Sequence, residues 1–480
     1  MGGGLMQLVA YGAQDIYLTG NPQITFFKVV YRRHTNFAME LISQTFAGSI
    51  SAGCESKATI SRNGDLVHDC FLEMTCIRVK HDIASNKNNC CNASGEASTA
   101  WDGDTLVGVP NLGTALINNI EVNIGGQCID KHYGHWMETY NQLTVSTDPG
   151  QVEYNDLKGV SHLPNNFQAM SHSGGVVTTN YGNQWNTCCE DVPNSSVCPT
   201  NCCTGDENGL VKSISNEIRL PLQFWFCRNP GLALPLIALQ YHEVEVRVLF
   251  NSLGGVWTGE AATAQDTKKV NLNTDKMKAC LWCNYIYLDT DERRRFAQVS
   301  HEYLIEQVQF QCESAVASKY RLNFNHPVKE LVFIGTPHKG MCYNKCINSA
   351  SSGPSTPGLI TNSNLNKLTL SLNGQDRFSP QPMSYFTQWQ VNQYHSGQGG
   401  RGLLDQAGQH GLPMPTIGVY SFALKPEEHQ PSGTCNFSRI DTAELCFDAG
   451  KQSFSGLYVY AVNYNVLRIM SGMGGLAYSN

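Results

Sequence analysis

A strand–turn–helix pattern that occurs twice is the feature that most constrains the fold of this chain. In each copy, apolar and polar residues alternate over five positions, which is the period of a strand with one buried face. A glycine follows the strand, and then two aromatic residues four apart, as on one face of a helix that covers a sheet. The copies consist of residues 120–124, Gly126, Trp136 and Tyr140, and of residues 368–372, Gly374, Tyr385 and Trp389.

Two further pairs of short motifs extend this similarity along the chain. Residues 41–44 (LISQ) match residues 304–307 (LIEQ), and residues 284–288 (NYIYL) match residues 463–467 (NYNVL). The separation between partners decreases along the chain, from 263 to 248 to 179 residues, so the copies run in the same order. The pattern predicts a duplicated domain whose first copy carries the longer loops.

The strong regular segments between these motifs have the character of strands, and helices serve only as single connections. Residues 242–249 alternate cleanly, with three valines predicted to face a core. Residues 58–79 are predicted to form a hairpin around a turn at Asn63-Gly64. These patterns predict an all-β chain made of two tandem antiparallel β-sandwiches.

The boundary between the copies is predicted at a charged turn, residues 289–295. The chain then divides into an N-terminal arm (residues 1–25), a first sandwich with long loops (residues 26–292) and a second sandwich (residues 293–480). The length favours such a division, because 480 residues exceed what one hydrophobic core usually supports.

Composition and termini disfavour several classes of protein. The net charge is −7 and charged residues make up only 15%, which disfavours a broad electrostatic grip on nucleic acid. No apolar run approaches the roughly 20 residues needed to span a bilayer. The N-terminus lacks the features of a secretory signal, and Met6 stands where a myristoylation motif requires Ser or Thr. We therefore expect synthesis and use in the cytosol.

Cysteine is abundant, with 19 residues, and most are expected to be free thiols that behave as small apolar groups. One polar loop holds five of them. Zinc ligation and a late disulfide are alternatives there, but free thiols are favoured because adjacent cysteines rarely converge tetrahedrally. Cys280 and Cys283 lie in a predicted strand, where an odd separation directs the sulfurs to opposite faces. The loop cysteines are Cys188, Cys189, Cys198, Cys202 and Cys203.

One row of residues resembles a metal-ligand set. His132, His135 and Glu138 recur at three-residue steps on the helix predicted after residues 120–124. Nothing else in the sequence converges on this row, and Lys131 stands beside it. A packed or solvated helix face is therefore the favoured interpretation.

A second group, Glu427-Glu428-His429, has the composition of a small catalytic site. It stands between Pro426 and Pro431, so a tight turn explains it better. The sequence contains no phosphate-binding loop, nucleophile elbow or zinc-protease helix motif. These observations predict a protein that is not an enzyme and needs no cofactor or metal.

Five long segments carry a specific resemblance: residues 8–37, 229–246, 285–307, 420–441 (YSFALKPEEHQPSGTCNFSRID) and 463–480 (NYNVLRIMSGMGGLAYSN). Together they closely resemble the major capsid protein of nucleocytoplasmic large DNA viruses, the group of algal, amoebal and iridescent viruses. The segments lie in both copies and near both termini, so the resemblance extends over the whole chain.

The resemblance implies two tandem eight-stranded antiparallel jelly rolls with short connecting helices and long loops. It also implies that three protomers form a homotrimer, a pseudo-hexagonal capsomer that tiles the icosahedral shell of a large double-stranded DNA virus. Residues 146–215 are then expected on the outer face of the shell and the N-terminal arm on its inner side. The protein would be a component of the virion capsid, made and assembled in the host cytoplasm.

The same resemblance implies the partners. They are further copies of the chain, neighbouring capsomers, minor capsid or cement proteins and penton proteins, with an inner membrane beneath the shell and no direct contact with the genome. An alternative function is a glycan-binding or glycan-cleaving double β-sandwich. Asn92, Asn194 and Asn436 stand in glycosylation sequons and are candidate modification sites, although relatives can be glycosylated without a sequon.

Overall fold

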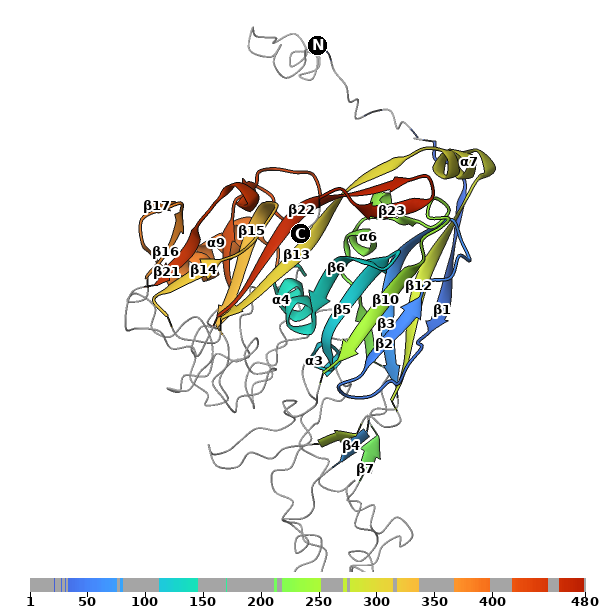
Figure 1. Cartoon of the computed structure of the whole chain (residues 1–480), viewed down its shortest axis with the longest axis horizontal. Coiled ribbons are helices and arrows are strands. Elements are labelled where there is room, and N and C mark those ends of the chain that lie inside the picture. Colours follow the sequence, from blue (N-terminus) through green and yellow to red (C-terminus); the bar gives the residue numbers. More distant parts are fainter. Residues whose placement is uncertain are drawn as a thin grey trace, which may run out of the picture.

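The structure, a computed structural model, contains two strand-rich bodies side by side, with helix α4 (Gly134–Thr144) between them (Figure 1). Each body consists of two antiparallel sheets packed face to face. The residues that the structure describes are 33–75, 78–80, 112–145, 211–213, 218–251, 271–273, 277–313, 317–335, 367–397, 417–447 and 457–478, with the single positions 21, 27, 31 and 170.

The first body is formed by one sheet in the order β1-β12-β3-β8 and a facing sheet in the order β2-β10-β5-β6. Strand β9 (Leu234–Pro235) also pairs with β3. The first sheet contains β1 (Phe37–Thr45), β12 (Lys278–Leu288), β3 (Leu66–Thr75) and β8 (Ile218–Pro221), and the facing sheet contains β2 (Glu55–Thr59), β10 (Val244–Phe250), β5 (Ile117–Ile124) and β6 (Gln127–Tyr133).

The second body repeats this design with sheets in the orders β13-β22-β15-β19 and β14-β21-β16-β17. The short strands β20 (Cys435–Asn436), β23 (Met473–Leu476) and β18 (Gln381–Pro382) add to these sheets. The main strands are β13 (His301–Glu313), β22 (Leu457–Met470), β15 (Pro327–Gly335) and β19 (Gly418–Ser421), facing β14 (Lys319–Leu322), β21 (Ala443–Phe447), β16 (Lys367–Leu372) and β17 (Gln375–Asp376).

The strand order identifies both bodies as jelly rolls. When the eight main strands of each body are counted along the chain, one sheet has the order 1-8-3-6 and the other 2-7-4-5, identically in the two bodies. This is the double Greek-key arrangement of a jelly roll. The expectation of two tandem eight-stranded antiparallel jelly rolls is therefore confirmed.

The remaining described elements are short connections and a small sheet. Strands β4 (Arg78–Lys80), β7 (Val211–Ser213) and β11 (Asn271–Asn273) form that sheet at one end of the first jelly roll (Figure 1). The helices besides α4 are α3 (Leu112–Ala115), α6 (Trp225–Arg228), η5 (Pro230–Leu232), α7 (Thr290–Gln298), the π-helical η7 (Tyr385–Trp389), α9 (Gln390–Tyr394) and η8 (Phe437–Arg439).

The three motif pairs of the sequence lie on strands with the same position in the two jelly rolls, namely β1 and β13, β5 and β16, and β12 and β22. Their residue-by-residue match does not extend to the pairing register. Leu41 lies opposite Asn284, whereas Leu304 lies opposite Val466 and not opposite Asn463. The motifs therefore mark equivalent strands, and their register differs by three residues.

The turn after the repeated strand is also repeated. Gly125 and Gly126 connect β5 to β6 with φ angles of 59° and 84°, and Asn373 and Gly374 connect β16 to β17 with 51° and 77°. Two consecutive residues with positive φ form the type I′ turn that suits the twist of a two-residue hairpin. The glycines noticed in the sequence are thus required by the backbone conformation.

The predicted hairpin at residues 58–79 is wrong. Strand β2 pairs with β10 in one sheet, whereas β3 pairs with β12 in the facing sheet. The turn at Asn63-Gly64 therefore carries the chain across the core. Two consecutive strands bury the same alternating residues whether they pair edge to edge or face each other, so the local pattern does not distinguish these arrangements.

Two other local expectations need correction. Residues 289–295 belong largely to helix α7 and not to a turn; Asp289 caps this helix by accepting a hydrogen bond from the Thr290 amide at 2.8 Å. In the second copy, Trp389 does not share a buried face with Tyr385, because the π-helical turn rotates it outward and leaves it 61% exposed. Phe386 and Gln390 are buried instead.

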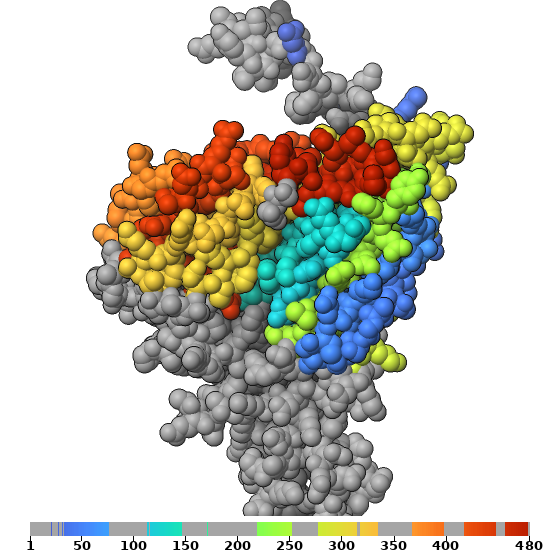
Figure 2. Space-filling model, viewed as in Figure 1, coloured from blue at the N-terminus to red at the C-terminus, as the bar shows by residue number. Residues whose placement is uncertain are grey.

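One pair of strands runs through both jelly rolls. Strand β22 contributes Val459 and Ala461 to the core of the second jelly roll and then Leu467 and Ile469 to the core of the first. Its partner β13 likewise places Ile305 in the first core. Figure 2 shows the C-terminal strands, in red, extending over the first jelly roll. The two bodies are therefore joined by continuous β-structure.

We expect Gly125→Ala to destabilise the protein more than Gly126→Ala. Both substitutions impose a positive φ on a residue with a side chain, at a cost of about 1–2 kcal/mol. At Gly125, however, the new Cβ would lie 2.4 Å from Nδ1 of His242, whereas at Gly126 nothing lies within 4 Å. The crowding should add about 1–3 kcal/mol, measured as a lower midpoint of urea unfolding. Equal midpoints for the two variants would contradict this account.

Candidate functional site

Helix α4 fills the space between the two jelly rolls. It follows β6 of the first jelly roll, and all residues from Gly134 to Leu143 are buried. Trp136 and Tyr140 pack on the outer face of the sheet β13-β22-β15-β19 of the second jelly roll, and the ring centroids of Trp136 and Tyr460 are 5.0 Å apart. The aromatic pair noticed in the sequence is therefore the apolar centre of the contact between the jelly rolls.

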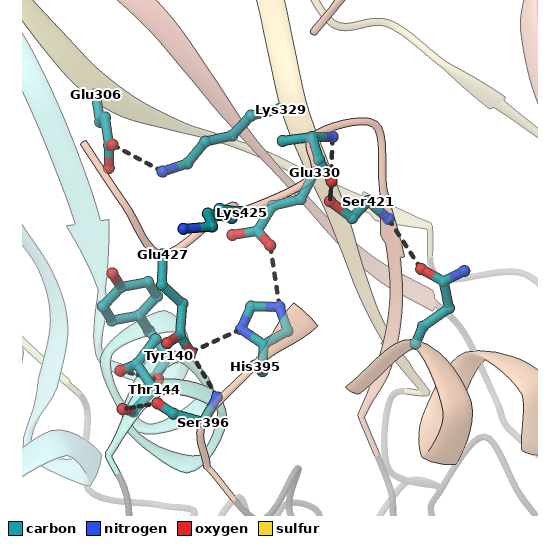
Figure 3. A network of polar contacts seen from close by, with 12 residues as sticks. Tyr140, Thr144, Glu306, Lys329, Glu330, His395, Ser396, Ser421, Lys425 and Glu427 are labelled. Atoms are coloured by element: carbon teal, nitrogen blue, oxygen red, sulfur yellow. Dashed lines mark hydrogen bonds and ion pairs between the residues drawn. The ribbon is translucent and has the colours of Figure 1, made fainter. Parts of the chain in front are cut away.

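A charged cluster lies beside this apolar contact. Glu306 of β13 accepts a hydrogen bond from Nζ of Lys329 at 2.7 Å and forms an ion pair with Arg228 at 2.8 Å (Figure 3 shows Glu306 and Lys329). Burial raises the pKa of Glu306, but the two cations outweigh burial and lower it, so the carboxylate is ionised. Arg228 also donates to the Tyr140 hydroxyl at 2.7 Å, which connects this cluster to α4.

A second charged cluster is centred on His395, directly after α9. Its Nε2 lies 3.0 Å from Oε2 of Glu330, and its Nδ1 lies 3.2 Å from Oε1 of Glu427 (Figure 3). Burial alone would lower the pKa of His395, but the two carboxylates outweigh it and raise the pKa to about 9. The imidazole is therefore a cation at neutral pH, which forms an ion pair with Glu330 and donates a hydrogen bond to Glu427.

The segment that follows His395 reaches across to the first jelly roll. The Ser396 hydroxyl donates to the Thr144 carbonyl at 2.7 Å, and the Gly397 amide donates to the Leu143 carbonyl at 2.7 Å. These contacts satisfy carbonyl groups at the C-terminal end of α4, which have no partner within the helix. A Cβ at Gly397 would lie 2.4 Å from the Gln142 carbonyl oxygen, so the close approach requires glycine.

The histidine row of the sequence does not lie on one helix face. His132 belongs to β6, because the strand continues to Tyr133 before the helix begins. Its Nε2 lies 3.0 Å from Oδ2 of Asp130 within the protein interior. His135 Nδ1 lies 3.1 Å from the Tyr460 hydroxyl, and burial lowers the pKa of His135 to about 3. All three side chains of the row are buried, but the predicted helical placement of His132 is wrong.

The turn at Glu427-Glu428-His429 contributes more than the sequence indicated. Glu427 contacts His395, and Nδ1 of His429 lies 3.9 Å from Glu306, so the turn touches both charged clusters. Glu428 is exposed and pairs with Lys425. The other members of the clusters were not predicted from the sequence. A signal that could have found some of them is a charged residue flanked by apolar residues in a strand, which indicates a buried partner. These members are Arg228, Glu306, Lys329, Glu330 and His395.

Comparisons with known proteins agree with this architecture. A family model described as "Major capsid protein N-terminus" matches residues 25–289, and a model described as "Large eukaryotic DNA virus major capsid protein" matches residues 292–475. The chain belongs to the major capsid proteins of large eukaryotic DNA viruses.

Relatives match this capsid protein over its whole length. It is 44% identical to the major capsid protein of Pyramimonas orientalis virus and 38% identical to that of Paramecium bursaria Chlorella virus 1, with 100% of both chains covered in each comparison. The crystal structure of VP54 of PBCV-1 superposes with a TM-score of 0.63 and 34% identity over 95% of this chain and 100% of that chain. The Faustovirus major capsid protein, at 12% identity, shares the fold with a TM-score of 0.60 over 96% of this chain and 94% of that one.

A cleft of about 230 Å³ opens between the jelly rolls of this capsid protein and is lined by Arg228, Glu306, Glu427 and His429 among others. A glycan-cleaving site requires a carboxyl group with a raised pKa to act as the acid. Both carboxylates here have lowered pKa values, because Arg228 and Lys329 outweigh burial at Glu306, and His395 and Ser396 together outweigh it at Glu427. The charged groups therefore fit a role in the contact between the jelly rolls better than a role in glycan hydrolysis.

Several sequence candidates concern other features. Within the described ranges, no three His, Cys, Asp or Glu side chains form a group that would hold a metal, and no helix there is long and apolar enough to cross a bilayer.

Cys283 is buried in the core and Cys280 is half-buried on the opposite side of β12, as expected. The five loop cysteines, Asn92 and Asn194 lie outside the described residues. Asn436 is exposed, and its Oδ1 accepts from the Ser438 amide at 3.1 Å.

We expect Glu306→Gln to destabilise the capsid protein strongly. The substitution leaves Arg228 and Lys329 without a counter-charge in a buried cluster, which typically costs about 3–5 kcal/mol. Glu302→Gln is the matched control, since Glu302 lies on the same strand but forms an exposed pair with Arg468. The control should change the free energy of unfolding by less than about 1 kcal/mol. Urea unfolding with similar losses for both variants would contradict the role of the cluster.

The stability of the protein should depend on His395 at alkaline pH. Because the folded pKa is raised from 6.5 to about 9, this stabilisation is fully present below pH 6.5 and is lost as pH rises through 9. The contribution is on the order of 3 kcal/mol. His395→Gln should lower the unfolding midpoint at pH 7 and remove most of the decrease between pH 7 and 9. Substitution of the exposed His34 by glutamine should leave that decrease unchanged; an unchanged decrease in His395→Gln would refute the assignment.

Proposed function

We propose that this structural capsid protein forms a homotrimer, and that its six jelly rolls make a pseudo-hexagonal capsomer that tiles the icosahedral shell of a large double-stranded DNA virus. The observation that carries the proposal is the presence of two jelly rolls with identical strand order in one chain. Three such chains around a threefold axis give six similar lobes, and closed cyclic symmetry is the usual arrangement of homo-oligomers.

The connection between the jelly rolls supports this proposal. A near-hexagonal outline requires a constant angle between the two lobes of every chain. The continuous strands β13 and β22, the buried helix α4, the ion pair between Arg228 and Glu306 and the hydrogen bond from Ser396 to Thr144 hold the lobes together. A chain with a flexible linker between two separate cores would not keep that angle.

We further propose the partners and the location of the protein. Neighbouring capsomers, minor capsid or cement proteins and penton proteins are the expected contacts, with an inner membrane beneath the shell. Direct contact with the genome is not expected from a chain with a net charge of −7. The protein is expected to be made and assembled in the host cytoplasm and to remain in the virion.

The division into an arm (residues 1–25), a first jelly roll (residues 26–292) and a second jelly roll (residues 293–480) also remains a proposal. It is supported by the helix α7, which lies between the last strand of one jelly roll and the first strand of the next. Glycosylation at Asn92, Asn194 or Asn436 remains a prediction, and peptide mapping of virion protein by mass spectrometry tests it.

Native mass spectrometry of the purified protein tests the trimer. Three chains of 52.9 kDa should give a species of about 159 kDa that persists on dilution to nanomolar concentration. Electron microscopy of that species should show a hexagonal outline. A protein that remains monomeric from nanomolar to millimolar concentration would argue against the proposed assembly.

A further inference from the structure

The repeated aromatic helix has opposite surroundings in the two jelly rolls. In the first jelly roll, α4 directly follows the hairpin of β5 and β6. Its Trp136 and Tyr140 are buried against the second jelly roll. In the second, η7 and α9 follow the equivalent strands β16 and β17, but Trp389 is 61% exposed. Among the described residues, no further jelly roll covers Trp389. A large exposed aromatic side chain at the position of a known contact suggests a contact in the assembly.

The surface that covers α4 has an equivalent on the first jelly roll. Helix α4 packs on the outer face of β13-β22-β15-β19, and the sheet with the same strand order in the first jelly roll is β1-β12-β3-β8. The outer face of that sheet carries exposed apolar side chains on its edge strand: Phe37 is 56% exposed, Met39 46% and Leu41 48%. Each chain thus carries an exposed aromatic side chain on one helix and exposed apolar side chains on the equivalent sheet of its other jelly roll.

The pairing register confirms that these side chains face outward. Met39 lies opposite Ile286, so both share the outer face, while the neighbouring Tyr285 belongs to the core. Beside them on this face, Phe71 stacks on Trp282 at 6.2 Å between centroids. The outer face is therefore apolar over several strands.

Only one end of this outer face is covered within the described residues. Ile286 packs with Leu66 and Ala233, and Phe296 of α7 lies against this group. The edge strand itself, with its three exposed apolar residues, has no described cover. Such an edge is normally protected in a soluble protein, because it offers both apolar side chains and free backbone groups to another chain.

We propose that η7 and α9 of one copy dock on the outer face of β1-β12-β3-β8 of a second copy, with Trp389 against Phe37, Met39 and Leu41. This inference rests on the proposed trimer and specifies its contact. The contact between chains then repeats the contact within a chain, where the first jelly roll presents the helix and the second presents the sheet. Three copies joined in this way form a closed ring in which contacts within and between chains alternate.

A second feature of the contact within the chain supports the same arrangement. There the edge strand β13 approaches β6: Gln307 donates through its side chain to the Ile129 carbonyl, and the Val308 amide donates to Oδ1 of Asp130 at 3.2 Å. The equivalent edge strand of the first jelly roll is β1, and its outer edge has no strand partner among the described residues. In the ring, β1 would take the place that β13 takes within the chain.

Aspartate substitutions at the two halves of the contact test the proposal. Trp389→Asp and Met39→Asp should each shift the protein from trimer to monomer in native mass spectrometry, because each buries a charge in an apolar contact. The two monomeric variants should stay folded and unfold at the same midpoint as each other, since both positions are exposed. Tyr241→Asp is the control: Tyr241 is 76% exposed but lies beside the β22–β23 turn, where a Cβ at Gly472 would lie 2.6 Å from its ring, and this variant should remain trimeric.

Oxidative footprinting separates docking from indirect effects. In the wild-type trimer, Trp389 and Met39 should both be protected from hydroxyl radicals; in Trp389→Asp, Met39 should become reactive, and in Met39→Asp, Trp389 should become reactive. Protection of Met39 in the monomeric variant would show that the chain's own residues cover the sheet, which would overturn the proposal. A trimeric Trp389→Asp would overturn this contact but leave the trimer intact, whereas a monomeric wild type would overturn the trimer as well.

Discussion

The antiparallel pair β13–β22 is the constraint on which the rest of the structure depends. A strand advances about 3.3 Å per residue, so the residues Leu457–Met470 extend roughly 46 Å, enough to cross from one jelly roll into the other. Val459 is buried in the second core and Leu467 in the first. Because both ends of one hydrogen-bonded pair are fixed in different cores, a hinge between the jelly rolls would require breaking the pair.

The contact around α4 also fixes the orientation of one jelly roll relative to the other. Trp136 supplies apolar burial to this contact, with its ring centroid 5.0 Å from that of Tyr460. Glu306 pairs with Arg228 of the first jelly roll and with Lys329 of the second, so this charged cluster favours one relative position of the two jelly rolls. Buried ion pairs often contribute little net stability compared with apolar packing. We expect their main effect here to be on the relative position of the two jelly rolls. A shell subunit benefits from alignment, since an error in one angle is repeated in every copy.

Much of the fold was predictable from local patterns. The alternation in residues 244–248, the glycines of the type I′ turns and the aromatic helix of the first copy were correctly located, because each depends on neighbouring residues. The expectations that failed depend on distant partners. The turn at Asn63-Gly64 joins two sheets because β2, before it, pairs with β10, whereas β3, after it, pairs with β12. The ion clusters were missed because their members lie far apart in the chain, and Arg228 meets Glu306 only when both jelly rolls have formed.

The sequence by itself determined that the chain is a doubled β-domain with equivalent strands in the same order, and its similarity to known capsid proteins assigned the family. Tertiary structure decided which sheet each strand joins, which charges are buried together, and that one aromatic helix is covered while its counterpart presents Trp389 to the surface. The physical reason is that periodicity specifies which face of an element is apolar. What covers that face is decided by residues far away in the chain, or in another copy of it.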